Sequence, residues 1–177
     1  MKKKLSAVML FVLGALAMVV FQQVGQTAPA LTALDYEEIR QLYARYAVAA
    51  DTGADDGAMW ADTFTEDGAF DVTNPTSGGS YPFEGYEQLK AYANRLETLR
   101  AENGIDDTPT HYVTNLLLEP TAEGAIGVAY NVGWVLEDRG TGVYHDQLVK
   151  TLKGWRFKSR TFTNGTFSDE LLQALEQ

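Results

Sequence analysis

Four side chains along the chain have the residue types of an acid–base site. Tyr46 and Asp51 lie near the end of an apolar helical pattern, and the chain's two histidines, His111 and His145, lie in its second half. An imidazole can take up and return protons near neutral pH, and a neighbouring carboxylate supports its charged form. A negative charge at the C-terminal end of a helix opposes the helix dipole, so Asp51 is better explained as the partner of an imidazole than as a solvated charge. The set predicts proton transfer without a cofactor.

The same residues also have a purely structural interpretation. Either histidine could be a satisfied interior or edge residue, and Tyr46 could be ordinary core. Five helical residues turn through about 140°, so Tyr46 and Asp51 point to one spot only if the helix ends or tightens there. Against this, each histidine alternates with apolar and polar side chains on one strand face, as expected for a cavity wall. The expected faces are His111 with Val113, Asn115 and Leu117, and His145 with Val143, Gln147 and Val149.

Other kinds of site lack their motifs. The chain has no cysteine, and its two histidines lack the spacing of a zinc site. No phosphate-binding loop, dinucleotide fingerprint, calcium loop or nucleophile elbow is present. We therefore expect neither a metal nor a cofactor.

The start of the chain is typical of an export signal. Three lysines, an apolar run over residues 5–21 and an Ala-Pro-Ala sequence ending at Ala30 predict a signal peptide over residues 1–30, or a membrane anchor if it is not removed. The chain carries a net charge of −10, and residues 31–177 carry −13. Such acidity argues against nucleic acid and anionic membranes as partners and favours a neutral, hydrophobic small molecule. Export without cysteine indicates a bacterial periplasmic or secreted protein.

Hydrophobic periodicity predicts one α+β domain. Helical patterns cover 33–51, 55–64 and 86–102, with Asp55 as a possible cap of the second helix and Gly53 placed to end the first. Residues 66–68 are expected to form a turn and residues 74–82 a loop. Alternating patterns then predict strands over 110–119, 125–138, 142–152 and 155–163. We expect three N-terminal helices packed on a strongly curved antiparallel sheet, a domain over 31–167, and a short tail over 168–177.

Three phrases carry a resemblance to a known superfamily. LYARYAVAADTGADDGAMWADTFTEDGAF, HYVTNLLLE and GVYHDQLVKTLKGWRFKSRTF resemble the SnoaL-like branch of the NTF2-like superfamily over residues 33–163. The resemblance implies a cone-shaped fold. Within it, Tyr46, Asp51 and His111 match the order and spacing of the catalytic set of bile-acid 7α-dehydratases. Asp51 and His111 also match scytalone dehydratases, where His145 falls near an active-site asparagine; a second histidine and a strand serine of that family are lacking.

The resemblance implies a lyase or isomerase that acts on a small hydrophobic hydroxy or keto compound. Substrate contacts would come from Asn115 and from the aromatic residues Trp60, Phe64, Tyr112 and Trp134. Two other classes stay open: a module that only binds a small ligand, and a structural protein that pairs through its sheet. Superfamily members often form homodimers, and a homodimer or trimer is expected here.

Overall fold

The computed structural model describes residues 30–75, 77–104, 110–135 and 138–165. The expected signal segment up to residue 29 and the tail over 168–177 fall outside the described residues. The elements are α2 (Ala33–Thr52), η1 (Ala54–Gly57), α3 (Ala58–Ala61), β1 (Phe64–Asn74), β2 (Gly79–Glu84), α4 (Tyr86–Glu102), β3 (Thr110–Pro120), β4 (Ala125–Val135), β5 (Asp138–Thr151) and β6 (Gly154–Asn164). In the described part of the chain, no helix has the length and apolarity needed to cross a bilayer.

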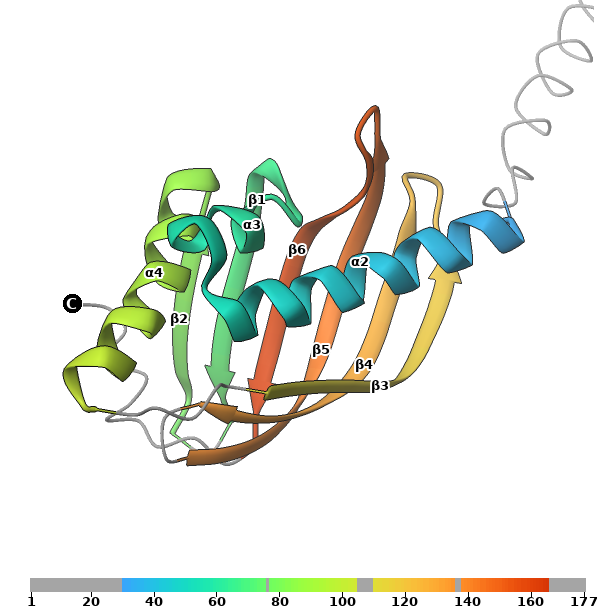
Figure 1. The fold of residues 1–177 in the computed structure, drawn as a ribbon. Coiled ribbons are helices and arrows are strands. Elements are labelled where there is room, and N and C mark those ends of the chain that lie inside the picture. Colours follow the sequence, from blue (N-terminus) through green and yellow to red (C-terminus); the bar gives the residue numbers. More distant parts are fainter. Residues whose placement is uncertain (1–29, 76, 105–109, 136–137, 166–177) are drawn as a thin grey trace, which may run out of the picture.

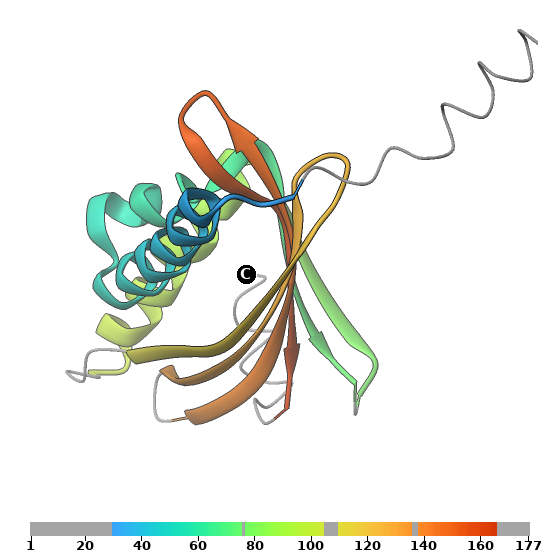
Figure 2. The ribbon, with the colours of Figure 1, turned by 90° about the vertical axis from the view of Figure 1, so that its right-hand side faces the viewer.

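The helices lie on one side of a curved sheet, which confirms the expected α+β cone (Figures 1 and 2). The described strands form a six-stranded sheet in the order β2-β1-β6-β5-β4-β3. Neighbouring strands are antiparallel except β1 and β6, which run parallel. Figure 2 shows β3, β4 and β5 bending toward the helices at one end. The face that α2 covers is called the inner face below, and the opposite face the outer face.

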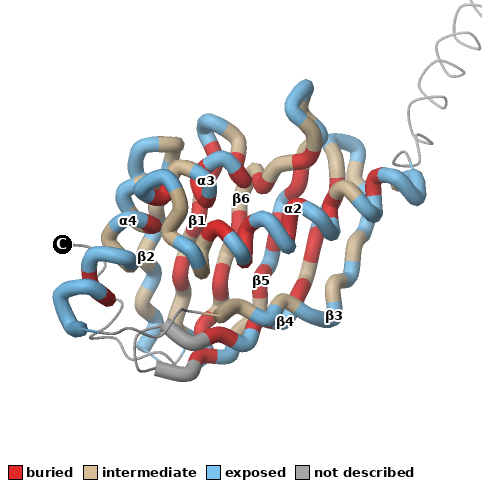
Figure 3. The backbone as a smooth tube through the Cα atoms, viewed as in Figure 1, coloured by how far each residue is buried: buried red, intermediate tan, exposed pale blue. Residues whose placement is uncertain are grey.

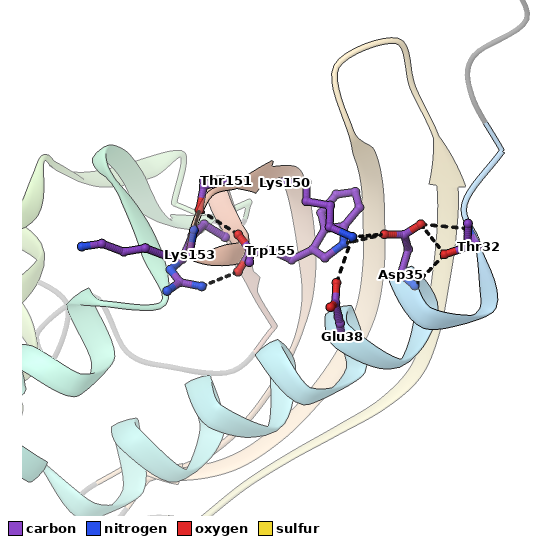
Figure 4. Close-up of polar contacts among 9 residues, drawn as sticks. Thr32, Asp35, Glu38, Lys150, Thr151, Lys153 and Trp155 are labelled. Carbon is purple, nitrogen blue, oxygen red and sulfur yellow. Dashed lines mark hydrogen bonds and ion pairs between the residues drawn. The ribbon is translucent and has the colours of Figure 1, made fainter.

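Both ends of α2 are fixed by their sequence. Thr32 and Asp35 form a capping box, in which the backbone N–H of each residue donates to the side chain of the other. The Asp35 carboxylate also accepts hydrogen bonds from Lys150 and Trp155 at 2.7 and 3.1 Å, which ties the start of α2 to the β5–β6 hairpin (Figure 4). Gly53 ends the helix in the left-handed conformation, with φ 57°, as its position predicts. The last turn of α2, which carries Asp51, is thereby held in place.

The segment after α2 differs from the expectation in three ways. The second helix is divided into η1 and α3, because Asp55 and Asp56 have φ of 54° and 52°. It ends at Ala61, and Asp55 does not cap it. The expected turn over 66–68 lies inside β1, where the pairing with β6 is irregular between Phe64 and Ala69. The expected loop over 74–82 overlaps β2, which pairs with β1 as an edge strand. Pro82 is compatible with an edge, since an edge residue needs no N–H toward a neighbour.

Aromatic side chains fill the space between α2, α3 and the sheet. Buried (red) segments gather where the helices cross β1, β6 and β5 (Figure 3). Tyr46 and Trp60 lie at the centre of this core, with ring centroids 5.3 Å apart. Phe64, Phe70, Tyr144, Phe157 and Phe162 also belong to it. The aromatic core packs between α2 and the sheet, so the end of α2 rests on packed side chains.

Candidate acid–base site

A groove runs between α2 and the edge strand β3. It encloses about 1060 Å³. Its walls come from both elements and include Arg40, Tyr43, Ala47, His111, Val113 and Leu116. On α2 these positions recur every three or four residues, so they form one stripe of the helix. The stripe continues to Asp51, one turn beyond Ala47.

Asp51 and His111 form a close pair at one end of this groove. Nδ1 of His111 lies 2.5 Å from Oδ1 of Asp51, and the backbone N–H of His111 donates to Oδ2 at 3.1 Å. The side chains are 12% and 18% exposed, so the pair is largely shielded from water. Two contacts to one carboxylate fix the orientation of the ring. The approach of these two residues that the sequence predicted is therefore present.

The pair has the arrangement of a supported base. With its proton on Nδ1 and donated to Asp51, the neutral imidazole presents Nε2 as the nitrogen that can accept a proton. The Asp51 carboxylate then stabilises the imidazolium that forms. The same contacts would also hold the ring in place for simple ligand binding, so geometry alone permits both uses.

Tyr46 does not join the pair. It is 3% exposed and packs in the aromatic core, while the groove is lined by Tyr43 from the preceding turn. Burial raises the pKa of Tyr46, so its hydroxyl stays protonated at neutral pH. Because α2 stays helical through Thr52, positions 46 and 51 are about 140° apart around the helix axis, and their side chains point in different directions.

His145 lies on the other side of the sheet. It is exposed, and it pairs with Val128 and Thr161 across the ladders of β5. Successive strand residues point to opposite faces, and the buried neighbours Tyr144 and Asp146 show that the inner face belongs to the even positions here. The expected grouping with Val143, Gln147 and Val149 therefore lies on the outer face, away from Asp51 and His111.

The expected substrate contacts are divided among different places. Asn115 lines the groove, and Tyr112 borders it with a side chain that is 58% exposed. Trp60 and Phe64 belong to the buried core. The backbone of Trp134 pairs with Thr110, and its side chain falls outside the described residues.

A strand irregularity changes which residues of β3 face the groove. Asn115 has φ of 54°, and the pairing with β4 gains one residue between Thr114 and Leu117. This is a β-bulge. Beyond it, Leu116 and Leu118 face inward and Leu117 is 59% exposed, so Leu117 does not share the face of His111 as expected.

A buried polar cluster under α2 was not predicted from the sequence. Arg160 donates to both carboxylate oxygens of Asp146, at 2.7 and 2.8 Å, and the Tyr43 hydroxyl donates to the same carboxylate. Arg160 also lies against four aromatic rings, those of Tyr43, Tyr46, Tyr144 and Phe157. Although burial disfavours the charged guanidinium, Asp146 raises the pKa of Arg160. A lone acid between Tyr144 and Leu148 in a strand was the available signal for a buried charge.

Comparison with known protein families identifies the domain. The family model of the SnoaL-like domain matches residues 31–161. The chain belongs to the SnoaL-like family. None of the curated protein sequences matches it.

Solved structures share the fold of this SnoaL-like domain. The Mycobacterium tuberculosis protein Rv3472, of unknown function, is 28% identical, with a TM-score of 0.62 over 76% of this chain and 78% of that chain. An NTF2-like protein with a cystatin-like fold from Novosphingobium aromaticivorans is 24% identical, with a TM-score of 0.61 over 81% and 89%. A protein from the same organism that is provisionally named a scytalone dehydratase is 19% identical, with a TM-score of 0.56 over 77% and 87%. The last two show the fold alone.

The SnoaL-like domain thus combines an open groove with a carboxylate–imidazole pair. Among the described residues, no cluster of three or more His, Asp or Glu side chains is arranged to hold a metal ion. The fold is compatible with small-molecule binding and with isomerase or dehydratase chemistry. Family membership does not choose between them, because function depends on the site and not on the fold.

Proposed function

We propose that this SnoaL-like protein is a cofactor-free lyase or isomerase for a small hydrophobic hydroxy or keto compound. The observation that supports it is the Asp51–His111 pair, with Nδ1 and Oδ1 2.5 Å apart at the end of the groove. Holding a carboxylate against an imidazole away from water costs desolvation energy. The apolar walls alone would hold an apolar ligand, whereas a supported imidazole adds a group that can transfer a proton.

The reaction follows from the roles of the two residues. Nε2 of His111 removes a proton from a carbon next to a carbonyl or conjugated system, while Asp51 stabilises the imidazolium through Nδ1. In a dehydration, the electrons of the broken C–H bond form a C=C bond, and the neighbouring C–O bond breaks. The imidazolium returns its proton to the departing hydroxide, which leaves as water. In an isomerisation, the proton returns to another carbon of the same molecule.

The substrate would enter between α2 and β3. Ala44, Ala47, Val113 and Leu116 give the groove apolar surfaces that hold a flat molecule and exclude water. The basic and apolar start of the chain, residues 1–30, extends the proposal to an exported enzyme. Substrate affinity would then depend on the apolar walls of the groove, and the reaction rate on the Asp51–His111 pair.

Variants of Asp51, His111 and His145 test the proposal. Compounds retained by the purified protein are identified by mass spectrometry. These compounds, together with a panel of hydroxy and keto compounds, are incubated in D₂O and monitored for loss of water or gain of deuterium. His111→Ala and Asp51→Asn are expected to lower kcat by about 10²–10⁴-fold with little change in KM. The matched control is His145→Ala, which changes the chain's other histidine on the outer face and should leave kcat unchanged.

The outcomes separate the classes. A folded His111→Ala variant with unchanged kcat would make the pair structural. If no compound gains deuterium or loses water, but a retained ligand binds less tightly to both variants, the groove is a carrier's pocket and the enzyme proposal is wrong.

A further inference from the structure

The groove between α2 and β3 has an arginine on its wall in addition to the acid–base pair. Arg40 of α2 lines the groove and is exposed. Among the described residues, its guanidinium group forms no ion pair. Glu37 is a neighbour of Arg40 on the helix surface, but its carboxylate accepts a hydrogen bond from Gln41 at 2.9 Å. The donors of Arg40 are therefore available to a molecule in the groove.

The lining of the groove differs in charge from the protein as a whole. The chain carries −10, yet none of the described residues that line the groove is an aspartate or a glutamate. The acidity of the chain predicts a neutral ligand, because surface acids repel an anion. At physiological ionic strength that repulsion is screened over about 8 Å. The side chains that line the groove, Arg40 among them, therefore decide which charge it accepts.

Arg40 and the acid–base pair lie toward opposite ends of the groove. Positions 40 and 51 of α2 are about 16 Å apart along the helix axis. Figures 1 and 2 show β3 running along α2 in the opposite direction, so the start of β3, with His111, lies near the end of α2. Between the two ends the walls are apolar and include Ala44, Ala47 and Leu116.

This arrangement fits an amphipathic acid. A guanidinium group recognises a carboxylate through two parallel hydrogen bonds, and a single arginine balances a single negative charge. The apolar walls hold a hydrocarbon body. The separation along α2 places the carboxylate about 10 Å or more from a carbon that reacts at His111. An acid that is much shorter would reach only one of the two groups.

We propose that Arg40 binds a carboxylate of the substrate and thereby holds the hydroxyl-bearing or keto-bearing end of the molecule at His111. The inference rests on the proposed function, because it takes His111 as the base. It narrows the substrate class to hydroxy or keto acids with an apolar body between the carboxylate and the reacting carbon. Arg40 sets the specificity and takes no part in proton transfer.

Two fluorescent probes that differ in charge test this site. 1-Pyrenebutyrate carries a carboxylate on a flexible arm, and 1-pyrenebutanol carries a hydroxyl group in its place; their affinities for the purified protein are measured by fluorescence titration. The protein is expected to bind the acid about 3–10-fold more tightly, as one charged contact at an exposed arginine predicts. Arg40→Gln should abolish that preference and keep the affinity for the alcohol. Added salt should also reduce the preference, because it screens the charges.

Arg45→Gln is the matched control. Arg45 is also an exposed arginine of α2, but it lines a separate pocket together with Asp62 and Arg156. The two substitutions change the net charge of the protein equally, so a difference between them reports the position of the charge. Arg45→Gln should keep the preference for 1-pyrenebutyrate.

A second pair of variants tests the space itself. Ala47 lines the groove between Arg40 and Asp51, so Ala47→Leu adds bulk to its middle and should weaken binding of both probes. Ala33→Leu makes the same change at an exposed alanine in the first turn of α2, outside the groove, and should alter neither affinity. Once a reacting acid is found, Arg40→Gln should raise its KM and leave kcat nearly unchanged.

The inference fails if Arg40→Gln keeps the preference for 1-pyrenebutyrate, or if Arg45→Gln loses it to the same extent. It also fails if the unmodified protein binds the two probes equally or binds neither. Failure of the proposed function would look different. Arg40→Gln would then lose the preference as expected, yet no compound would react in the unmodified protein.

Discussion

Two aspartates of α2 show how position decides what a carboxylate does. Asp35 lies in the first turn, where its charge suits the helix dipole and where Thr32, Lys150 and Trp155 donate to it. Asp51 lies in the last turn, where the dipole opposes its charge. His111 supplies the compensation there through its ring and its backbone N–H. The first aspartate therefore ties α2 to the β5–β6 hairpin, and the second holds the imidazole that we propose as the base.

The Asp35 contacts predict how the protein responds to acid. Lys150 above all, with Thr32, lowers the pKa of Asp35 below its ordinary value of 3.8. A carboxyl group whose pKa is lower in the folded state stabilises that state above the unfolded-state pKa. That contribution is lost as the pH falls through the lower, folded-state pKa. Asp35→Asn should therefore lower the unfolding temperature at neutral pH, and its difference from the unmodified protein should shrink below about pH 4.

Thermal unfolding measured from pH 8 to strongly acidic pH checks this, with the difference between the two proteins as the readout. Glu37→Gln, a change of an exposed acid in the same helix, is the control and should produce only a small difference. A difference for Asp35→Asn that stays constant down to the lowest pH would show that the charge of Asp35 does not matter.

At the residue scale, the sequence predicted the Asp51–His111 pair but not the directions in which Tyr46 and His145 point. Asp51 was identifiable because a carboxylate at a helix C-terminus needs a partner, and the resemblance to the dehydratases assigned that partner to His111. The choice between Tyr43 and Tyr46 depends on which side of α2 faces β3, and both tyrosines fit the apolar pattern of the helix. The face of His145 likewise depends on which strand face the helices cover. The alternating pattern of a strand shows that successive side chains point to opposite faces of the sheet, but it does not show which face the helices cover.

At the scale of elements, the long strands and helices were predictable and the irregular ones were not. The expected helices over 33–51 and 86–102 and the last four strands agree with the structure to within a few residues. β2 was missed because its segment follows a run rich in Pro, Gly and Ser, which normally marks a loop. An edge strand tolerates such composition, since one side of it needs no hydrogen bonds. Glu66, Asp67 and Gly68 have the composition of a turn, yet they lie inside β1, in the irregular stretch between Phe64 and Ala69, which both pair with β6.

The bulge in β3 gives a prediction at this scale. Asn115 adopts φ of 54°, a conformation that glycine accepts freely, asparagine tolerates and β-branched residues strongly disfavour. Asn115→Gly should change the free energy of unfolding by only a few tenths of a kcal/mol, while Asn115→Val should lower it by about 1–2 kcal/mol. Denaturant unfolding measures both. The valine variant should also bind probes in the groove more weakly, because Leu116 and Leu118 face inward only through the bulge.

The adjacent position provides the control for this prediction. Thr114→Val places the same side chain in the regular part of β3, on an exposed position, and should leave stability nearly unchanged. Equal stability of the glycine and valine variants at position 115 would mean that the bulge does not require its left-handed residue.

At the scale of the whole molecule, the two faces of the sheet differ in how they are covered. The inner face is packed under α2, α3 and α4. The outer face of β3 and β4 exposes five large apolar side chains between 37% and 59%: Tyr112, Leu117, Ile126, Tyr130 and Val132. The five side chains are neighbours on this face. Tyr112 pairs with Val132 across the β3–β4 ladder, and Leu117 pairs with Val128, which lies between Ile126 and Tyr130 on the same face of β4. These five residues are called the outer patch. Contiguous apolar surface of this kind commonly marks a site of protein association.

The charge of the chain indicates what covers the outer patch. The protein carries −10, so two copies repel each other over most of their surface. The outer patch itself contains no charged residue, and two copies can approach there with little electrostatic cost. We propose that a second copy of the chain covers the outer patch and forms a homodimer. A two-fold dimer uses the same patch on both copies, which this arrangement allows.

Tyr130 lies in the middle of the outer patch, and its replacement tests the homodimer. Buried aromatic residues at the centre of an interface contribute most of the binding energy, about 2 kcal/mol or more each. Tyr130→Glu would in addition place a negative charge opposite its symmetry mate. Sedimentation equilibrium is expected to show a dimer for the unmodified protein and a dissociation constant at least about 30-fold higher for the variant.

Leu152→Glu is the control for this prediction. It introduces the same charge at a fully exposed leucine of the β5–β6 turn, outside the outer patch, and should leave the dimer intact. A monomer in the unmodified protein, or equal weakening by both variants, would show that the outer patch does not join two copies.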